Sequence, residues 1–521
     1  MPRLLLALIL CTFMPVHAAD TFTFSNAAGP HAVGVKVVQQ YDRTRRYKMP
    51  TDLVTGEPAR GERARPVQTL IWYPADRGGT PVTFRDYLET MTTEDEFARS
   101  AVDVKRLTQI RIGNNAGSRR AALLRDIDGP MQAVRNARAR AGKFPVVIYA
   151  PSFSASAVEN ADLCEYLASH GYVVLSSPSL GVHARAMTAD LEGLEAQAGD
   201  IAYLIGYAYS LPQADADNVA VVGFSWGGLA NVLAAAKDER IKAIVSLDGS
   251  VRGTREFVDG GKDAAKYVTP ARVAIPMLFV GRRPATVEEL NRAQVDTRYS
   301  FMNEMKYSDV YLVSMLPMKH MDFSSYQLRM APDDSFGDHT RDDIALAHSW
   351  AVRYVRHFLD AKLKHDAAGL AFIDNTPHAN RAPAHMMIAD IRRSTGGLAP
   401  TLENFVVQLA KSGFDQAVPL YDKMAAQTAT FKLGPDKIYG WASQLASIER
   451  PHQALEIFRL GTHLHPHDSD MLDGLAEMQA RTGQTQQALR SYRRVLELDP
   501  KNLDAVKYLK EHGAAQAGTA P

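Results

Sequence analysis

Short apolar segments alternate with longer amphipathic segments from residue 33 to residue 363. Apolar runs of about four to eight residues are typical of buried strands, and the segments between them have helical spacing. The predicted strands span residues 33–39, 67–73, 145–149, 172–176, 219–223, 241–247, 273–280 and 310–315. The predicted helices span residues 155–170, 184–210, 227–236, 287–307 and 342–363. This alternation indicates an α/β fold with a doubly wound, mostly parallel sheet covered on both faces.

Residues 84–138 interrupt the alternation with a polar, mostly helical stretch that has no strand pattern. A connection of this length inside a compact domain usually forms a lid or a binding loop. We therefore expect a helical lid insertion in an α/β domain that spans residues 20–371. Residues 372–400 contain several prolines and the pair Gly396-Gly397, which predicts a linker to a second domain.

The C-terminal part of the chain repeats with a period of 34 residues, which is the period of tetratricopeptide helix hairpins. The matched pairs are Gly440/Gly474, Ala442/Ala476, Ala454/Ala488, Leu455/Leu489, Phe458/Tyr492, Leu464/Leu498 and Pro466/Pro500. Residues 401–513 are therefore predicted to form an all-α array of tetratricopeptide-like repeats, followed by a disordered tail at 514–521. The resemblance to such arrays implies a peptide or protein partner.

The first residues have the pattern of a signal peptide. Arg3 provides a positive charge, residues 4–14 are apolar, and residues 16–18 form an Ala-type cleavage site. The apolar run is too short to span a bilayer, so no transmembrane anchor is expected. We expect residues 1–19 to be removed on export, which would place the protein in the periplasm or outside the cell. Cleavage would leave Cys164 as the only cysteine, and its surroundings predict a buried thiol.

Composition and charge narrow the possible partners. The chain has 521 residues, of which 46% are hydrophobic and 22% are charged, as is ordinary for a globular protein with more than one domain. A formal net charge of +1 argues against nucleic acid, which needs a concentrated basic surface. His463, His465 and His467 alternate in one loop. No second cluster of ligands accompanies them, so no metal site is predicted.

The main chemical motif is a nucleophile elbow. Ser225 is the central residue of Gly223-Phe224-Ser225-Trp226-Gly227, directly after one predicted strand and before an Ala-rich predicted helix. This Gly-x-Ser-x-Gly pattern places a serine on a tight turn, where its hydroxyl lies above the sheet. The pattern in this context predicts a serine hydrolase with Ser225 as nucleophile.

An acid and a base follow at the ends of later predicted strands. Asp248 ends one strand, and His320 lies in the loop after another. Chain order Ser, Asp, His is the order of nucleophile-elbow hydrolases, and the ends of parallel strands meet at one edge of the sheet. His320 is predicted to remove the proton of Ser225, and Asp248 to orient the imidazole. Glu288 and Glu289, after the next strand, are the alternative acids.

An oxyanion site needs backbone donors close to the nucleophile. The N–H of Trp226, the residue after the serine, is the first candidate. The second candidate is the N–H of Phe153, in the loop after the third strand of the α/β core. Pro151 in that loop is excluded because proline has no N–H.

These motifs resemble the α/β-hydrolase superfamily and, within it, the platelet-activating-factor acetylhydrolase and dienelactone-hydrolase-like branch. The likeness covers residues 29–364, and its motifs are 29–34, 41–43, Arg65-Pro66, 72–75, the elbow, Leu247-Asp248 and 320–323. It implies an ester hydrolase without a cofactor, with Asp248 as the acid. Two departures are Pro151-Ser152, where the family often has His-Gly, and Ser225, where dienelactone hydrolases proper have cysteine.

The predicted function is hydrolysis of a small-molecule or lipid-like carboxylic ester through an acyl-enzyme, without metal or organic cofactor. Three alternatives stay open at this point. The first two are a peptidase of the same fold and an acyltransferase that passes the acyl group to an acceptor other than water. The third is a repeat-based scaffold that carries a vestigial hydrolase domain.

Overall fold

The computed structural model describes residues 21–52, 55–115, 120–292, 301–428 and 431–513. It divides into two compact units, Met1–Gly396 and Gly397–Pro521, and each is described by itself. The predicted signal peptide at 1–19 and the predicted tail at 514–521 lie outside the described residues.

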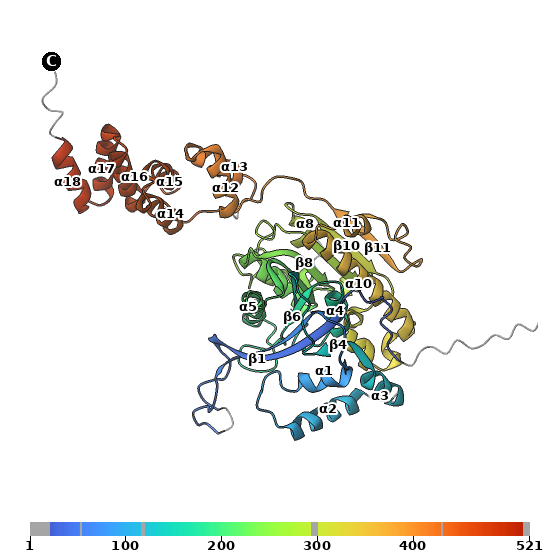
Figure 1. The fold of residues 1–521 in the computed structure, drawn as a ribbon. Helices are drawn as coiled ribbons and strands as arrows, with labels where there is room; N and C mark the ends of the chain where they lie inside the picture. Colours follow the sequence, from blue (N-terminus) through green and yellow to red (C-terminus); the bar gives the residue numbers. More distant parts are fainter. Residues whose placement is uncertain (1–20, 53–54, 116–119, 293–300, 429–430, 514–521) are drawn as a thin grey trace, which may run out of the picture. The chain divides into compact units, whose positions relative to one another are not determined.

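The first unit is built on one sheet of 11 strands, in the order β11-β10-β9-β8-β7-β5-β6-β2-β1-β4-β3 (Figure 1). The strands are β1 (Ala32–Arg46), β2 (Ala64–Ala75), β3 (Pro81–Thr83), β4 (Pro130–Arg135), β5 (Phe144–Ala150), β6 (Val173–Ser176), β7 (Ala214–Phe224), β8 (Ile241–Leu247), β9 (Met277–Arg282), β10 (Val310–Met315) and β11 (Met387–Arg392). Neighbouring strands from β6 to β10 run parallel, whereas β2 and β11 pair antiparallel with the two ends of this block. The predicted α/β fold with a mostly parallel sheet is confirmed.

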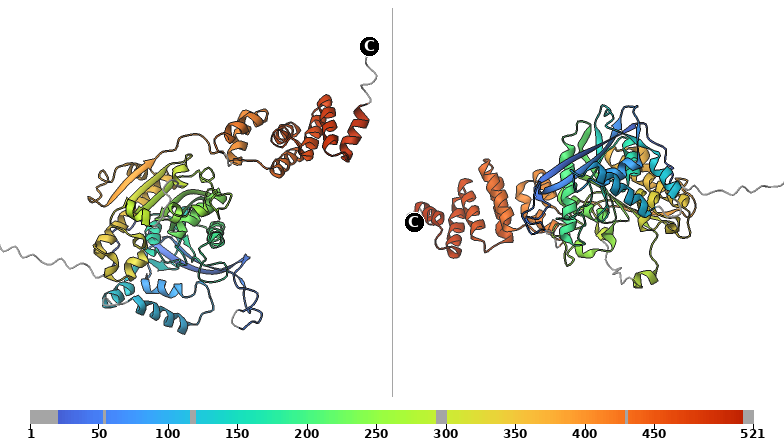
Figure 2. Two further views of the ribbon diagram at one scale, coloured as in Figure 1. Left: turned by 180° about the vertical axis from the view of Figure 1, so that it is seen from behind. Right: turned by 90° about the horizontal axis from the view of Figure 1, so that it is seen from below.

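Helices cover both faces of the sheet, as Figures 1 and 2 show. The helices of this unit are α1 (Phe84–Met91), α2 (Ala101–Asn115), α3 (Arg120–Asp128), α4 (Ala161–Ser169), α5 (Leu191–Ala208), α6 (Trp226–Lys237), α7 (Val287–Arg292), α8 (Phe301–Glu304), α9 (Ser325–Met330), α10 (Arg341–Leu363) and α11 (Ala367–Asp374). Successive residues of β5 serve opposite faces: Val147 packs in the cluster that holds α4 and α10, and Val146 in the cluster that holds α5 and α6. Burial on both faces explains why this strand is apolar throughout.

Two expectations about the edges of this unit were wrong. Residues 84–138 form three helices as predicted, but they also contain β4, which pairs with β1 and β3. Residues 372–400 are not only a linker, because β11 lies within them and pairs with β10. Both strands lie towards the edges of the sheet and are only partly buried, so their sequences lack the apolar run that marks the central strands.

Three of the predicted helices are shorter than expected. The helix predicted at 155–170 is α4, which begins at Ala161 after a series of turns. The helix predicted at 184–210 begins at Leu191, where Asp190 caps it by accepting a hydrogen bond from the N–H of Gly193. The helix predicted at 287–307 appears as α7 and α8, and residues 293–300 lie outside the described part.

The second unit is a run of helices: α12 (Leu402–Ser412), α13 (Ala417–Ala425), α14 (Pro435–Ser447), α15 (Pro451–Leu464), α16 (Ser469–Arg481), α17 (Thr485–Leu498) and α18 (Leu503–Gly513). The bounds of α16 and α17 follow those of α14 and α15 with an offset of 34 residues at each end. Gly474 in α16 lies against the ring of Phe458 in α15, where a Cβ atom would come within 2.3 Å of the ring. The sequence period therefore corresponds to a structural repeat of two helices.

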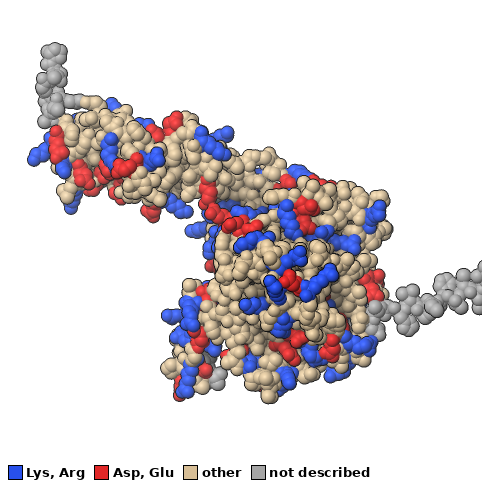
Figure 3. All heavy atoms as spheres, viewed as in Figure 1, with Lys and Arg blue, Asp and Glu red and all other residues tan. Residues whose placement is uncertain are grey.

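Lys and Arg side chains are mixed with Asp and Glu side chains over the face drawn in Figure 3, on both units. Cys164 is buried, as predicted. Among the described residues, no helix has the length and apolar character needed to cross a membrane. The same residues contain no group of three or more His, Cys, Asp and Glu side chains placed to hold a metal ion.

Candidate active site

Ser225 stands on a strained turn between β7 and α6. Its backbone has φ +53° and ψ −114°, a conformation that residues with a side chain rarely adopt. The turn is tight because its glycines touch backbone: a Cβ atom on Gly227 would lie 2.1 Å from the carbonyl oxygen of Ala150. A Cβ atom on Gly223 would lie 2.5 Å from Gly227. The two glycines of the motif are therefore required by close approach of the chain.

The structure brings Ser225, His320 and Asp248 into one hydrogen-bonded line. The Nε2 atom of His320 lies 2.8 Å from the Oγ atom of Ser225, and its Nδ1 atom lies 2.6 Å from Oδ2 of Asp248. The other carboxylate oxygen of Asp248 accepts a hydrogen bond of 3.1 Å from the N–H of Arg282. Each of the three residues follows the carboxyl end of a parallel strand, which is why residues far apart in the chain meet here.

The alternative acids have other partners. Glu289 pairs with Arg283 at 2.5 Å, and Glu288 pairs with Arg292 at 2.8 Å, on or next to α7. Asp322, close to His320 in sequence, accepts a hydrogen bond of 2.7 Å from the N–H of Lys319. Of the carboxylates considered from sequence, Asp248 is the one placed on the imidazole.

The side chains of the two residues that carry the candidate oxyanion donors are in contact. The ring of Phe153 contacts the indole of Trp226 edge to face, with centroids 5.5 Å apart. Within the described part of the chain, neither backbone N–H donates to another protein group. Both donors are therefore available to a bound oxygen atom. The next residue, Ser154, has φ +55°, which marks a sharp turn of the loop at this point.

A buried carboxyl group that sequence reasoning missed holds the loop of Phe153. Glu159 accepts hydrogen bonds from the N–H of Ser152 at 2.8 Å and from the hydroxyl of Tyr149 at 3.0 Å, and its second oxygen accepts from the hydroxyl of Ser152. Burial raises the pKa of Glu159 to about 7, although these hydrogen bonds favour its ionised form. Glu159 is the first acidic residue after the strand predicted at 145–149, and this position beside the site was the signal that could have found it.

The same segment also holds the loop that carries His320. The side chain of Asn160 donates to the carbonyl oxygen of Phe323 at 3.0 Å and accepts from the N–H of Ser325 at 2.7 Å. The carbonyl oxygen of Glu159 accepts from the N–H of Tyr326 at 3.0 Å. Residues 159 and 160 thus fix both the candidate oxyanion loop and the histidine loop.

The ionisation of Glu159 makes a testable contribution to stability. A carboxyl group whose pKa is higher in the folded than in the unfolded protein binds more protons when folded, so its contribution to stability falls as pH rises. Between pH 6 and pH 8 this loss is about 1 kcal/mol for a folded pKa near 7. Glu159→Gln removes this titration. Relative to the wild type, the urea concentration at which the variant is half unfolded should therefore be higher at pH 8 than at pH 6.

The control for this measurement is Glu57→Gln, which changes an exposed carboxylate. Its stability relative to the wild type should be the same at pH 6 and pH 8. If Glu159→Gln also showed no change with pH, the buried carboxyl would not titrate in this range.

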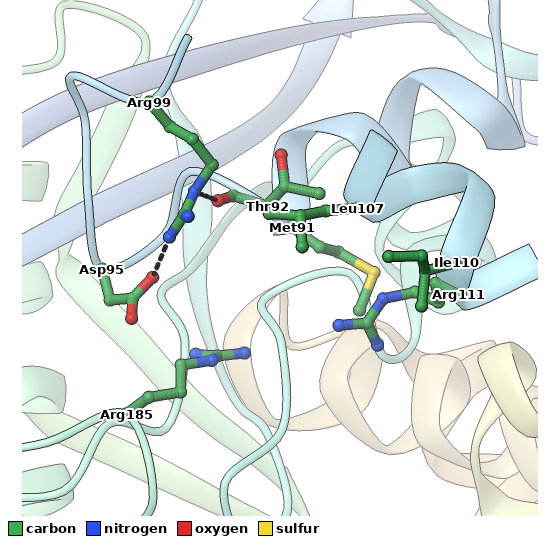
Figure 4. A pocket seen from close by; sticks show the side chains of 8 residues that line it. All are labelled: Met91, Thr92, Asp95, Arg99, Leu107, Ile110, Arg111 and Arg185. Carbon is green, nitrogen blue, oxygen red and sulfur yellow. Dashed lines mark hydrogen bonds and ion pairs between the residues drawn. The ribbon is translucent and has the colours of Figure 1, made fainter. Parts of the chain in front are cut away.

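A cavity of about 440 Å³ is lined by residues between 91 and 111 and by Arg185 (Figure 4). Its lining residues are Met91, Thr92, Asp95, Arg99, Leu107, Ile110, Arg111 and Arg185. Arg99, Arg111 and Arg185 come from three segments: the α1–α2 connection, α2, and the loop between β6 and α5. The cavity combines an apolar wall with three guanidinium groups.

Comparison with known proteins places the chain in a family. Residues 91–380, more than half of the chain, match the family model described as X-Pro dipeptidyl-peptidase (S15 family). Ser225, Asp248 and His320 all lie within the matched residues. No curated protein matches the chain.

Among solved structures, the chain is similar to a ferulic acid esterase from Streptomyces cinnamoneus. The identity is 18%, the match covers 68% of this chain and 96% of that one, and the TM-score is 0.45. The extent of the family match is what decides the assignment. The chain belongs to the S15 family of serine hydrolases, the family of the X-Pro dipeptidyl-peptidases.

Proposed function

We propose that the protein is a serine carboxylic-ester hydrolase with Ser225 as nucleophile, His320 as general base and acid, and Asp248 as the group that orients the imidazole. The observation that carries this proposal is the line of hydrogen bonds from Ser225 Oγ to His320 Nε2 and from His320 Nδ1 to Asp248, at 2.8 and 2.6 Å. These are contact distances for proton transfer.

The geometry supports a two-step acyl transfer. As the hydroxyl oxygen of Ser225 attacks the ester carbonyl, its proton passes to His320, and Asp248 stabilises the imidazolium that forms. The backbone N–H groups of Trp226 and Phe153 would hold the oxyanion. The leaving alcohol takes the proton from His320, and water then repeats the sequence on the acyl-enzyme.

The second candidate is an X-Pro dipeptidyl-peptidase, which the family match favours. Such an enzyme has to bind the positively charged amino terminus of its substrate. The cavity next to the loop of Phe153 is lined by three arginines. Its acidic neighbours Asp95 and Glu94 are already paired with Arg99 and Arg185, at 3.5 and 2.8 Å. This charge disfavours an ammonium group and supports the ester substrate, as does the resemblance to the acetylhydrolase branch.

The test compares an ester with an amide that has the same type of leaving group. We expect the purified chain to hydrolyse 4-nitrophenyl esters of graded acyl length, and to hydrolyse Ala-Pro-4-nitroanilide at least about 100 times more slowly in kcat/KM, a difference of about 2.7 kcal/mol in transition-state stabilisation. Faster hydrolysis of the anilide would support the peptidase instead. Product analysis with added alcohols or sugars would reveal acyl transfer.

Two further proposals concern the rest of the chain. The 34-residue period of the second unit supports tetratricopeptide-like repeats that bind a peptide or protein partner. The N-terminal pattern supports export through a signal peptide to the periplasm or the medium. If the repeats alone were functional and the hydrolase vestigial, a fluorophosphonate probe would fail to label Ser225.

A further inference from the structure

The arginine-lined cavity is joined to the candidate oxyanion loop by direct hydrogen bonds. Glu94, adjacent to the cavity-lining Asp95, accepts hydrogen bonds from the hydroxyl of Ser156 at 2.5 Å and from the N–H of Ala157 at 2.9 Å. On the other side, the N–H of Met187, two residues beyond Arg185, donates to the hydroxyl of Ser154 at 2.8 Å. Residues 154–157, which directly follow Phe153, are therefore held by hydrogen bonds to Glu94 and Met187, and both of these residues are close in sequence to residues that line the cavity.

This connection limits the distance between Phe153 and the residue that Glu94 binds, beside the cavity wall. Ser156 lies three positions after Phe153 in the chain, and a chain spans at most about 3.6 Å per residue. The Cα atom of Ser156, whose hydroxyl donates to Glu94, therefore lies within about 11 Å of the Cα atom of Phe153.

The lining residues define the chemistry of the ligand. Arg99, Arg111 and Arg185 provide three positive charges, and the acidic groups beside them, Asp95 and the fully buried Glu94, provide two negative charges. The lining thus has a net positive charge. Figure 4 shows Asp95 and the three arginines around one space, with Arg185 on a separate segment of the ribbon. Guanidinium groups form paired hydrogen bonds with carboxylates, while Met91, Leu107 and Ile110 suit an apolar chain.

We propose that this cavity is a subsite for an anionic group, so that the preferred substrates are esters with a carboxylate at the far end of a short apolar chain. This inference rests on the proposed ester hydrolase function. It gives the lid a role in choosing the substrate, and it names a class of substrate that neither the elbow nor the family match specifies.

The kinetic test uses two esters that differ only in the terminal charge. 4-Nitrophenyl hydrogen glutarate and 4-nitrophenyl pentanoate have acyl chains of five carbon atoms, and the wild type should prefer the glutarate in kcat/KM by about 10- to 100-fold, the usual worth of a hydrogen bond to a charged group. Arg111→Gln should remove most of this preference by slowing the glutarate reaction more than the pentanoate reaction. A second pair places the charge on the alcohol part of the ester. The pentanoate ester of 4-hydroxybenzoate carries a carboxylate there, and the pentanoate ester of methyl 4-hydroxybenzoate does not.

The matched control is Arg106→Gln. Arg106 lies on α2 with Arg111 but is exposed, pairs with Asp103 at 3.0 Å and does not line the cavity. This variant should keep the full preference.

Arg185→Lys keeps a charge beside buried Glu94 and should lower the preference without loss of fold, as circular dichroism would report. A higher kcat/KM for the charged ester in either pair supports the subsite. Equal rates within both pairs of esters, or a preference that survives Arg111→Gln, would overturn it.

A binding measurement separates failure of the subsite from failure of the proposed function. Calorimetric titration of free glutarate into the Ser225→Ala chain does not depend on hydrolysis. Glutarate should bind, glutaramide should bind at least about tenfold more weakly, and Arg111→Gln should abolish the difference. If no ester is hydrolysed but glutarate binds in this way, the hydrolase proposal fails alone. If esters are hydrolysed and glutarate does not bind, the subsite fails alone.

Discussion

The Ser225→Ala variant is expected to lose ester hydrolysis by about 10,000-fold to a million-fold in kcat. The hydroxyl of Ser225 is the group that the His320 imidazole contacts, at 2.8 Å, and the methyl group of alanine leaves no atom to attack the carbonyl. Losses of about this size follow removal of a nucleophile whose partners act as a unit. The measurement is steady-state hydrolysis of a 4-nitrophenyl ester, together with labelling by a fluorophosphonate probe, which should disappear.

The control for this variant is Ser210→Ala, which changes an exposed serine at the end of α5. Its activity and labelling should equal those of the wild type. The Ser225→Ala protein should also keep its fold, because alanine occupies the same backbone position with a smaller side chain. Persistence of hydrolysis and labelling in a folded Ser225→Ala protein would show that another residue is the nucleophile.

The Asp248→Asn variant is expected to have the second largest effect, a loss of about 10,000-fold in kcat near neutral pH. This is the size known for the same exchange in the Ser-His-Asp serine protease that serves as the general template. The carboxylate accepts a hydrogen bond from Nδ1 of His320 at 2.6 Å and so keeps Nε2 free to take the proton of Ser225. An amide in this place favours the wrong tautomer.

Two features make Asp248→Asn a clean experiment. Asp248 has φ +41°, a conformation that asparagine tolerates as well as aspartate does, so the fold should persist. Glu289→Gln provides the comparison, because Glu289 is the acid that would follow the next strand and is instead paired with Arg283. This variant should keep its kcat within about twofold. Equal losses in both variants would contradict the assignment of Asp248.

The central part of the fold was predictable because its strands are buried on both faces. Segments such as 145–149 and 219–223 are apolar at every position, and this pattern is rare outside such sheets. β4, next to the edge strand β3, and β11, at the other edge, were missed because strands near the edges are partly exposed and need no such pattern. In β11, Met387, Ala389 and Ile391 alternate with polar or exposed residues, which is a two-residue period that could have identified it.

The candidate triad was predictable for a different reason. Parallel strands end at one edge of the sheet, so residues that follow strand ends are brought together whatever their distance in sequence. Ser225, Asp248 and His320 satisfy this rule. Glu159 and Asn160 do not, because they act from the start of a helix through contacts with two loops. The cavity was also beyond sequence reasoning, since its arginines come from three separate segments whose packing no local pattern encodes.

Glu94 connects a residue that lines the cavity with the loop of Phe153. Its carboxylate holds Arg185, which lines the cavity, and also Ser156 and Ala157, which continue the loop of Phe153. A substitution that reshapes the cavity wall around Glu94 would therefore also alter the support of the loop that carries Phe153, the candidate oxyanion donor. Relatives with new specificities would be expected to retain this carboxylate, or to replace both of its connections together.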